Sequence, residues 1–428
     1  MMHNQSVDIV INGGSTLGLL TALAILEHTA LSVAVIEQNQ ITHETADPRY
    51  VALAQNSVRY LAELGIDPHL LGPGIEQIHV SDQGHIGQCR LTAKEVSVAE
   101  LGVVVNLSAL TQCITDKLYE KYVDSGRLLI YSGYVLQSVE SIALAPLQLL
   151  VAPHTEAHIG PEVNPQATPF EDETPSVFTL SSELLFFADG ERSPLKTELG
   201  FTKSIVDFGQ YGVVANVAVD RVAYSRYHHP LTAFERFTKH GPLALLPIHT
   251  PAGQPAYQQW YSMVWCIAED QKDGFAAIDL AALQEVFGDR AGRFCASTKP
   301  YVFPLKLTQH QGVVQRCICL GNAAQALHPI AGQGFNLGVR DIKDAVFILQ
   351  SQIGAEQSVA HIAAQFSAQF TEYRRLDRAQ TVTATSALVS IFSNDIPGVN
   401  TLRNFGLLTL HKYPFLKSLF TQQAMGEK

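Results

Sequence analysis

The stretch that decides the fold is Val7-Asp-Ile-Val-Ile-Asn-Gly-Gly-Ser-Thr-Leu-Gly18, an apolar run that leads into a glycine-rich turn. A helix-like apolar run, Leu19 to Glu27, follows the turn, and a second apolar run, Ser32 to Ile36, ends at Glu37. A strand, a tight turn, a helix and a second strand in this order make the βαβ unit that binds dinucleotides. The opening segment therefore predicts an α/β fold with a nucleotide-binding edge.

Three positions of this unit match the expected binding roles. Gly13 makes the tight turn, Gly18 lets the helix pack closely on the strand, and Glu37 lies where an acidic residue binds the ribose hydroxyls. Ser15 stands in place of the second glycine, where a Cβ crowds a diphosphate but a hydroxyl can donate a hydrogen bond to it. The complete unit favours a bound adenine dinucleotide over a ligand-free crossover of the same shape.

Two further strand ends lie far along the chain. The apolar run Leu184 to Ala188 ends in Asp189-Gly190, which taken alone is typical of a plain turn. The segment Cys319 to Gly338 starts as an apolar strand and continues as a loop with Pro329, Gly332 and Gly334, before a helical run from Val339 to Leu349. Because ligands of open α/β folds bind at the carboxyl edge of the sheet, we expect these three strand ends to converge there.

These elements resemble the three fingerprints of the class A flavoprotein aromatic hydroxylases. Within that family the chain is most similar to the ubiquinone-biosynthesis branch, through the segments His79 to His85, Ala233 to Ala244 and Gly321 to Asp341. The wider family usually has Gly-Asp where this chain has Gly321-Asn322. Asn at this position resembles the group of that branch that hydroxylates polyprenylated methoxyphenols.

The resemblance implies an α/β architecture in which a Rossmann-like FAD-binding domain is interleaved with a β-sheet substrate domain, followed by C-terminal helices. The implied FAD-binding parts are residues 1–75, 101–205 and 306–355, the substrate parts are 76–100 and 206–305, and the helical region is 356–428. Short apolar or alternating runs between Gly209 and Ile267 independently indicate a sheet. Phe237, Trp260 and Trp265 are candidates to line its substrate side, although plain core roles stay open.

The resemblance also implies the chemistry: NAD(P)H reduces FAD, O2 adds to give a flavin C4a-hydroperoxide, and an electron-rich polyprenyl phenol attacks its distal oxygen. Glu37 would bind the adenosine ribose, Asp189 would lie on the pyrophosphate side, and Asn322 would bond the ribityl chain. The full set of implied cofactor-binding residues is Gly13, Gly18, Glu37, Arg49, Gln112, Asp189, Asn322, Gly332, Gly334 and Asn336. For Arg49 and Gln112 a plain surface role stays open.

Two residues are candidates for a catalytic role at the flavin. Pro329 would limit access to the face that reacts with oxygen. His328 is the nearest titratable residue by sequence, and both a base and a structural histidine remain open. Gly332, Gly334 and Asn336 would present their groups to the isoalloxazine ring, where N–H groups stabilise the negative charge of the reduced flavin.

Composition narrows the partners and the location. The net charge of −11 over 428 residues argues against nucleic acid as a partner. No Lys or Arg precedes Arg49, so a secretory signal is not expected and the prediction is a cytoplasmic protein. The stretch Leu402 to Phe420 combines apolar residues with three cations, which suits either peripheral binding to the inner membrane or a helix packed on the body. The six cysteines show no metal-ligand spacing, and no metal is expected.

Rival functions remain on the same scaffold. Halogenases of this type carry a Trp-x-Trp-x-Ile-Pro element, and the spacing between Trp260 and Trp265 does not match it. A prenyl-chain reductase and a sister ring hydroxylase of the ubiquinone pathway are further alternatives. The remaining alternative is a non-catalytic flavin-binding partner in a biosynthetic complex, with Ser15 as a sign of weakened cofactor binding.

Overall fold

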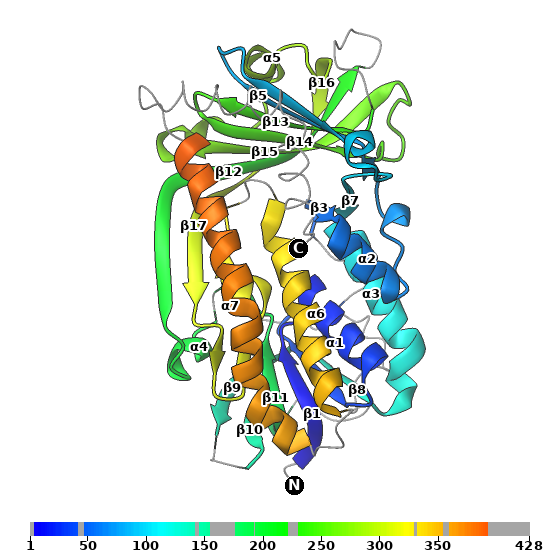
Figure 1. Ribbon diagram of the computed structural model, residues 1–428, viewed down its shortest axis with the longest axis vertical. Helices are drawn as coiled ribbons and strands as arrows, with labels where there is room; N and C mark the ends of the chain where they lie inside the picture. The colour runs from blue at the N-terminus through cyan, green and yellow to red at the C-terminus, as the bar shows by residue number, and fades with distance from the viewer. Residues whose placement is uncertain are drawn as a thin grey trace.

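The computed structural model describes residues 4–41, 47–141, 145–154, 176–191, 193–220, 230–328, 332–353 and 359–392. Its elements form a lower body of sheet and helices and an upper sheet, as oriented in Figure 1. The predicted Pro329 and the stretch Leu402 to Phe420 lie outside the described residues. Within the described part, no helix is both long and apolar enough to cross a membrane.

The lower sheet has eight strands. They are β1 (Asn4–Asn12), β2 (Val33–Glu37), β8 (Leu128–Ser132), β9 (Tyr134–Glu140), β10 (Leu147–Pro153), β11 (Phe178–Phe187), β18 (Val313–Val314) and β19 (Cys317–Cys319). The order β19-β11-β1-β2-β8 is parallel throughout. Ile9 and Ile11 are buried on one face of β1 and Val10 on the other, which is why the second half of this strand is a continuous apolar run.

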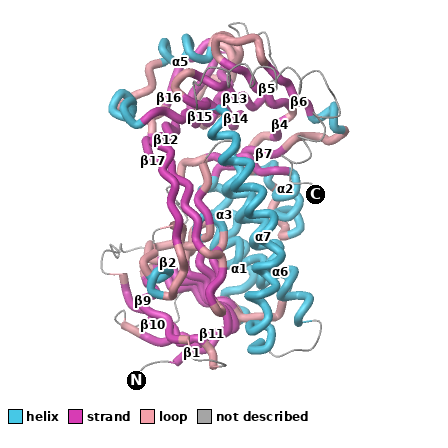
Figure 2. Tube along the Cα trace, turned by 60° about the vertical axis from the view of Figure 1, so that its left-hand side comes forward, coloured by secondary structure: helices cyan, strands magenta, loops and turns pink. Residues whose placement is uncertain are grey.

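Helices cover one face of the lower sheet, as Figure 2 shows. Among the described residues, the α-helices are α1 (Thr16–His28), α2 (Gln55–Glu63), α3 (Leu107–Tyr122), α4 (Leu195–Glu198), α5 (Leu280–Phe287), α6 (Gln333–Ile353) and α7 (Val359–Phe392). Short 3-10 turns occur at Pro68–Leu70, Ala93–Val96, Val123–Ser125, Glu269–Gly274 and Gly321–Ala323. Apolar side chains of α1, α3, α6 and α7 share one core with those of the sheet, so these four helices form a layer that packs against the sheet.

The upper sheet has nine strands. They are β5 (Gln77–Asp82), β6 (Gln88–Thr92), β12 (Lys203–Asp220), β13 (Thr232–Thr238), β14 (Gly241–Ile248), β15 (Gln258–Ala268), β16 (Arg293–Ser297), β17 (Tyr301–His310) and β20 (Gln325–Ala326). A small sheet of β3 (Tyr50–Ala54), β4 (Gly74–Ile75) and β7 (Gly102–Asn106) lies between the two bodies.

The two faces of the upper sheet differ in what covers them. On its outer face, Val213 and Val217 of β12 pack in one core with Phe287 of α5. On its inner face, Ala218 of β12 packs in another core with Val104 of β7. Because side chains alternate along a strand, the odd-numbered residues of β12 lie on the outer face and the even-numbered ones on the inner face. The inner face is therefore the one turned toward the small sheet and the lower body.

Two predicted domain boundaries fall within strands, and one predicted helix begins earlier than its sequence indicates. The boundaries at residues 205/206 and 305/306 fall inside β12 and β17, because these two strands stay paired from Lys203 opposite His310 to Val214 opposite Tyr301 and connect both bodies. The helix expected from Val339 begins at Gln333, so the glycine loop after Cys319 is shorter than its sequence indicates.

Candidate active site

The predicted strand ends meet at one edge of the lower sheet. Gly13, Glu37 and Asp189 directly follow or end β1, β2 and β11, and Asn322 follows β19. Since these strands are parallel neighbours, their carboxyl ends lie at the same edge. Helices α1 and α6 begin at this edge, with their N-termini toward the upper sheet in Figure 1. The positive ends of two helix dipoles therefore share one site.

The glycine turn leaves no room for side chains. Gly13 has a φ of +112°, and a Cβ there would lie 2.7 Å from the backbone N of Asp189. A Cβ on Gly18 would lie 1.8 Å from the carbonyl O of Gly13. The backbone N of Gly14 donates to Oε2 of Glu37 at 2.6 Å, which fixes that carboxylate beside the turn.

Ser15 occupies the N-cap of α1 without making a side-chain capping bond, and it is exposed. A serine at this position ordinarily accepts a hydrogen bond from the first turn. Its hydroxyl and the first N–H groups of α1 are instead open toward the shared edge. The departure from glycine is thus compatible with an anion bound at the helix N-terminus.

Asp189 already has protein partners at the edge. Its Oδ2 accepts from Nδ2 of Asn12 at 2.7 Å, and its Oδ1 lies 3.1 Å from Nζ of Lys196. Lys196 is completely buried and also donates to the carbonyl of Gly190. Burial raises the pKa of Asp189, although the Lys196 ammonium opposes that shift. Asp189 therefore neutralises a buried cation in addition to any contact with a cofactor.

Asn322 and the glycine loop lie together. Asn322 is exposed, and a Cβ on Gly334 would be 3.9 Å from its Oδ1. Gly332 has a φ of +59°, a conformation that favours glycine, and it directly precedes α6. The structure thus brings Asn322, Gly332 and Gly334 to the N-terminus of a long helix.

Asn336 is buried and its amide is engaged by backbone. Its Oδ1 accepts from the N of Ala54 at 2.8 Å, and its Nδ2 donates to the carbonyls of Ala52 at 2.8 Å and Gly332 at 3.1 Å. These bonds tie the glycine loop to β3. The Asn336 amide therefore positions the glycine loop, and its contact with a flavin ring stays a prediction.

His328 lies at the junction of the two bodies. Its Nε2 is 3.1 Å from Oε1 of Gln210 on β12, and its ring meets that of Phe208 edge-on with centroids 5.3 Å apart. Burial lowers the pKa of His328 to about 4. The imidazole is therefore neutral near pH 7, and these contacts suit the structural role that the sequence left open.

Arg49 and Gln112 lie apart from these contacts. Arg49 is exposed and pairs with Asp47, with Nε–Oδ1 and Nη2–Oδ2 distances of 2.8 and 2.6 Å. Gln112 donates to Asp116 at 2.6 Å on α3. Its neighbour Thr111 contacts Thr16 in the first turn of α1, so Gln112 lies near the start of that helix. The cofactor contacts expected for Arg49 and Gln112 stay predictions.

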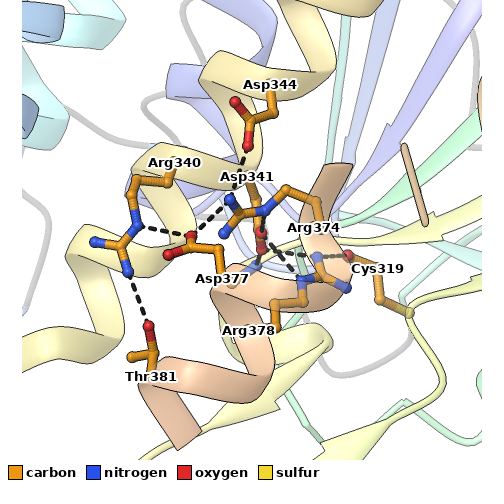
Figure 3. Close-up of polar contacts among 9 residues, drawn as sticks. Cys319, Arg340, Asp341, Asp344, Arg374, Asp377, Arg378 and Thr381 are labelled. Carbon is orange, nitrogen blue, oxygen red and sulfur yellow. Dashed lines mark hydrogen bonds and ion pairs between the residues drawn. The ribbon is translucent and has the colours of Figure 1, made fainter. Parts of the chain in front are cut away.

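A buried ion network joins α6 to α7 (Figure 3). Asp341 of α6 is fully buried, and its Oδ2 accepts from the N of Gly321 at 2.9 Å. Arg374 and Arg378 of α7 approach the same carboxylate at 2.7 and 2.9 Å. Burial opposes ionisation, but Arg378 and Arg374 hold the pKa of Asp341 below its ordinary value. In the sequence Asp341 is only the last residue of the segment Gly321 to Asp341, because its partners lie on another helix.

The candidate aromatics separate onto two faces. Trp265 lies on the outer face, where its ring packs edge-on against Phe275 with centroids 5.4 Å apart. Trp265 therefore has the plain core role that the sequence left open. Trp260 lies on the inner face and packs in the same core as Val104 of β7. Phe237 shares the inner face by strand alternation.

A family described as "FAD binding domain" matches residues 139–364, more than half of the chain. The chain belongs to this FAD binding domain family. The family resemblance inferred from the fingerprints is thus confirmed, and the chain is an FAD-dependent monooxygenase.

Relatives and solved structures match this FAD-dependent monooxygenase along most of its length. The ubiquinone hydroxylase UbiL of Rhodospirillum rubrum is 28% identical over 435 residues, covering 99% of this chain and 90% of that protein. The 3-demethoxyubiquinol 3-hydroxylase of Escherichia coli is 22% identical and covers 99% of this chain and 100% of that protein. The structure of p-nitrophenol 4-monooxygenase PnpA from Pseudomonas putida DLL-E4 has a TM-score of 0.72 at 15% identity, over 99% of each chain. This last likeness shows the fold.

Proposed function

We propose that this FAD-dependent monooxygenase hydroxylates a polyprenylated methoxyphenol in ubiquinone biosynthesis, with NAD(P)H as reductant and O2 as co-substrate. The observation that carries the proposal is the near full-length match to the ubiquinone hydroxylase UbiL. The Gly321-Asn322 pair adds to it through its resemblance to the methoxyphenol-hydroxylating group. The reaction to be tested is that of a 2-octaprenyl-6-methoxyphenol hydroxylase.

The shared edge supplies the groups that FAD requires. Glu37 would bind the adenosine ribose, the first turn of α1 with Ser15 would bind the diphosphate, and Asn322 would bond the ribityl chain. Gly332 and the N-terminus of α6 would place N–H groups against the isoalloxazine ring. These groups fit a dinucleotide that spans the edge from β2 to β19.

When bound, FAD takes a hydride from NAD(P)H and activates O2, so that one oxygen atom reaches the ring. The chain's own contribution is to hold the phenol over the flavin and to exclude water. The Asn336 amide keeps the glycine loop fixed on β3, and neutral His328 closes the junction between the bodies without adding a charge. Pro329 remains the proposed guard of the oxygen-reacting face.

A sister ring hydroxylase is the main alternative. It is favoured by the full-length match to the 3-demethoxyubiquinol 3-hydroxylase of Escherichia coli. The two candidates differ in the ring position that receives oxygen, and therefore in the precursor that accumulates when the enzyme is missing.

The test has a biochemical and a genetic part. Purified protein reconstituted with FAD should oxidise NAD(P)H and incorporate label from 18O2 into a short-chain 2-prenyl-6-methoxyphenol. A strain that lacks the gene should accumulate the polyprenyl-methoxyphenol itself. Accumulation of a precursor blocked at another ring position would assign the sister reaction. Protein that remains colourless with added FAD would support a non-catalytic role and overturn the proposal.

A further inference from the structure

One row of inner-face side chains crosses the upper sheet. The cross-strand partners in this row are Tyr301, Val214, Val264, Ala244, Glu235 and Val80, in the order β17-β12-β15-β14-β13-β5. None of the six is buried, whereas their outer-face neighbours Val213, Leu245 and Phe234 are. The row is therefore partly open to its surroundings, and Glu235 is its only charged member.

This row lies between two contacts at the junction of the two bodies. Toward one end of β12, Gln210 meets His328. Toward the other end, Ala218 packs with the small sheet, where Ala52 carries the glycine loop through Asn336. Val214 lies midway between Gln210 and Ala218 on the same face. His328 belongs to the first contact, and Gly332 is tied to the second through Asn336. The open row between these contacts therefore faces the side on which the flavin ring would lie.

Glu235 is unusual among the carboxylates of this sheet. It makes no hydrogen bond or ion pair with another described residue, whereas Asp207 pairs with Lys306 at 3.1 Å. Although Glu235 is only partly buried, desolvation by the protein around it raises its pKa to about 7. A partly desolvated carboxylate with no partner among the described residues gains from a ligand that supplies a donor. A base with a pKa near the working pH is also the most effective in proton transfer.

Building on the proposed function, we propose that Glu235 is the catalytic base that accepts the proton of the substrate's phenolic hydroxyl. The apolar members of the row would hold the ring and the start of its prenyl tail. The phenolic O–H bond breaks, its proton moves to a carboxylate oxygen of Glu235, and the bonding electron pair stays on the phenolate oxygen, where it makes the ring more electron-rich. After the ring has been hydroxylated, the carboxylic acid of Glu235 returns the proton to the phenolate oxygen.

Other titratable groups face Glu235 from neighbouring elements. They are Cys266 of β15, Asp82 of β5, Cys89 of β6 and Tyr50 of the small sheet. Burial and the Glu235 charge raise the pKa of the Cys266 thiol well above its ordinary value, so this group stays neutral near pH 7. A pH dependence near 7 would therefore report Glu235.

Glu235→Gln tests the assignment because it keeps the shape and removes the base. Hydroxylation should fall by roughly 10²- to 10⁴-fold, while NAD(P)H oxidation continues and releases hydrogen peroxide. In the wild type, kcat/KM should rise with pH through an inflection near 7, and this inflection should vanish in the variant. A fluorinated phenol of lower pKa should lose less rate in the variant than its parent, which a merely structural role would not produce.

A direct titration supplies a readout that does not depend on turnover. Difference infrared spectra of the wild type should show a protonated carboxyl band with a midpoint near pH 7, and Glu235→Gln should lack it. Asp207→Asn, which removes an exposed carboxylate of the same sheet, serves as the matched control and should retain activity and pH profile. Wild-type rate, coupling and pH profile in Glu235→Gln would overturn the assignment. Absence of hydroxylation in the wild type would instead refute the proposed function.

Discussion

At the scale of single residues, Asp189 has two roles that a single alanine substitution cannot separate. It is the counter-charge of the buried Lys196, and it is expected to contact the cofactor. Asp189→Ala should lower both FAD occupancy and stability, because removing the carboxylate leaves the buried Lys196 ammonium unpaired at a cost of about 3–5 kcal/mol. Chemical denaturation and the flavin absorbance of the purified protein measure the two effects.

The double variant Asp189→Ala with Lys196→Met separates the two roles. Its stability should recover, because no buried charge remains. FAD occupancy should stay low if Asp189 contacts the cofactor. Recovery of both quantities would remove Asp189 from the binding site and leave it as the counter-charge of Lys196.

His328 makes stability depend on pH. Its pKa of about 4 in the folded protein lies below the ordinary value of 6.5, so the unfolded chain binds the proton first as pH falls. The contribution of neutral His328 to the free energy of unfolding is therefore fully present above about pH 6.5 and decreases toward pH 4. At pH 5 about 2 kcal/mol of it is lost. His328→Gln should reduce the difference in unfolding free energy between pH 7.5 and pH 5 by that amount. His85→Gln, which changes an exposed histidine, should leave the difference unchanged.

At the scale of elements, the turn before α1 depends on the absence of a Cβ at Gly18. Gly18→Ala would place the new methyl 1.8 Å from the Gly13 carbonyl, so the turn or the helix must move. We expect loss of FAD binding and a lower melting temperature. Gly274→Ala is the matched control, because nothing lies within 4 Å of a Cβ there. Normal FAD affinity in Gly18→Ala would contradict the role given to this turn.

The contact between α6 and α7 depends on Asp341. Asp341→Asn keeps the shape but removes the charge that compensates Arg378 and part of Arg374, which should cost about 3–5 kcal/mol in unfolding free energy. Glu372→Gln on α7 breaks only an exposed pair with Arg375 and should change stability by less than about 1 kcal/mol. Urea denaturation of both variants checks the contrast. Equal stabilities would mean that the network contributes nothing net.

Local elements were predictable from sequence, and their partners were not. The apolar run and glycines around Gly13 determine the strand and turn within a few residues. Asp341 and Arg374 are joined only because two helices pack together, so no local pattern reveals their contact. The proposed role of Glu235 depends on the register of several strands, because that register places Ala244 and Val80 beside it. Long-range pairing is the information that periodicity lacks.

At the scale of the whole molecule, β12 and β17 make the two bodies one folding unit. Their ladder extends from Lys203 opposite His310 to Val214 opposite Tyr301, so neither body can unfold without breaking bonds in the other. The chain has two tryptophans, Trp260 and Trp265, both on β15. Tryptophan fluorescence therefore reports the upper sheet, whereas far-UV circular dichroism reports mainly the helices of the lower body. Their urea transitions should coincide, and an earlier fluorescence transition would contradict this prediction.

Because strands that are neighbours in the lower sheet are far apart in the sequence, the order of synthesis determines when the cofactor site can form. β1 is translated early, yet its partner β11 begins at Phe178 and β19 ends at Cys319. The nucleotide-binding edge is incomplete until α6 has also been translated, so the nascent chain must wait through most of its synthesis before it can load the cofactor. Until then β1 has an unpaired edge that other chains can reach. Supply of flavin late in translation, rather than early, should thus govern the yield of soluble protein.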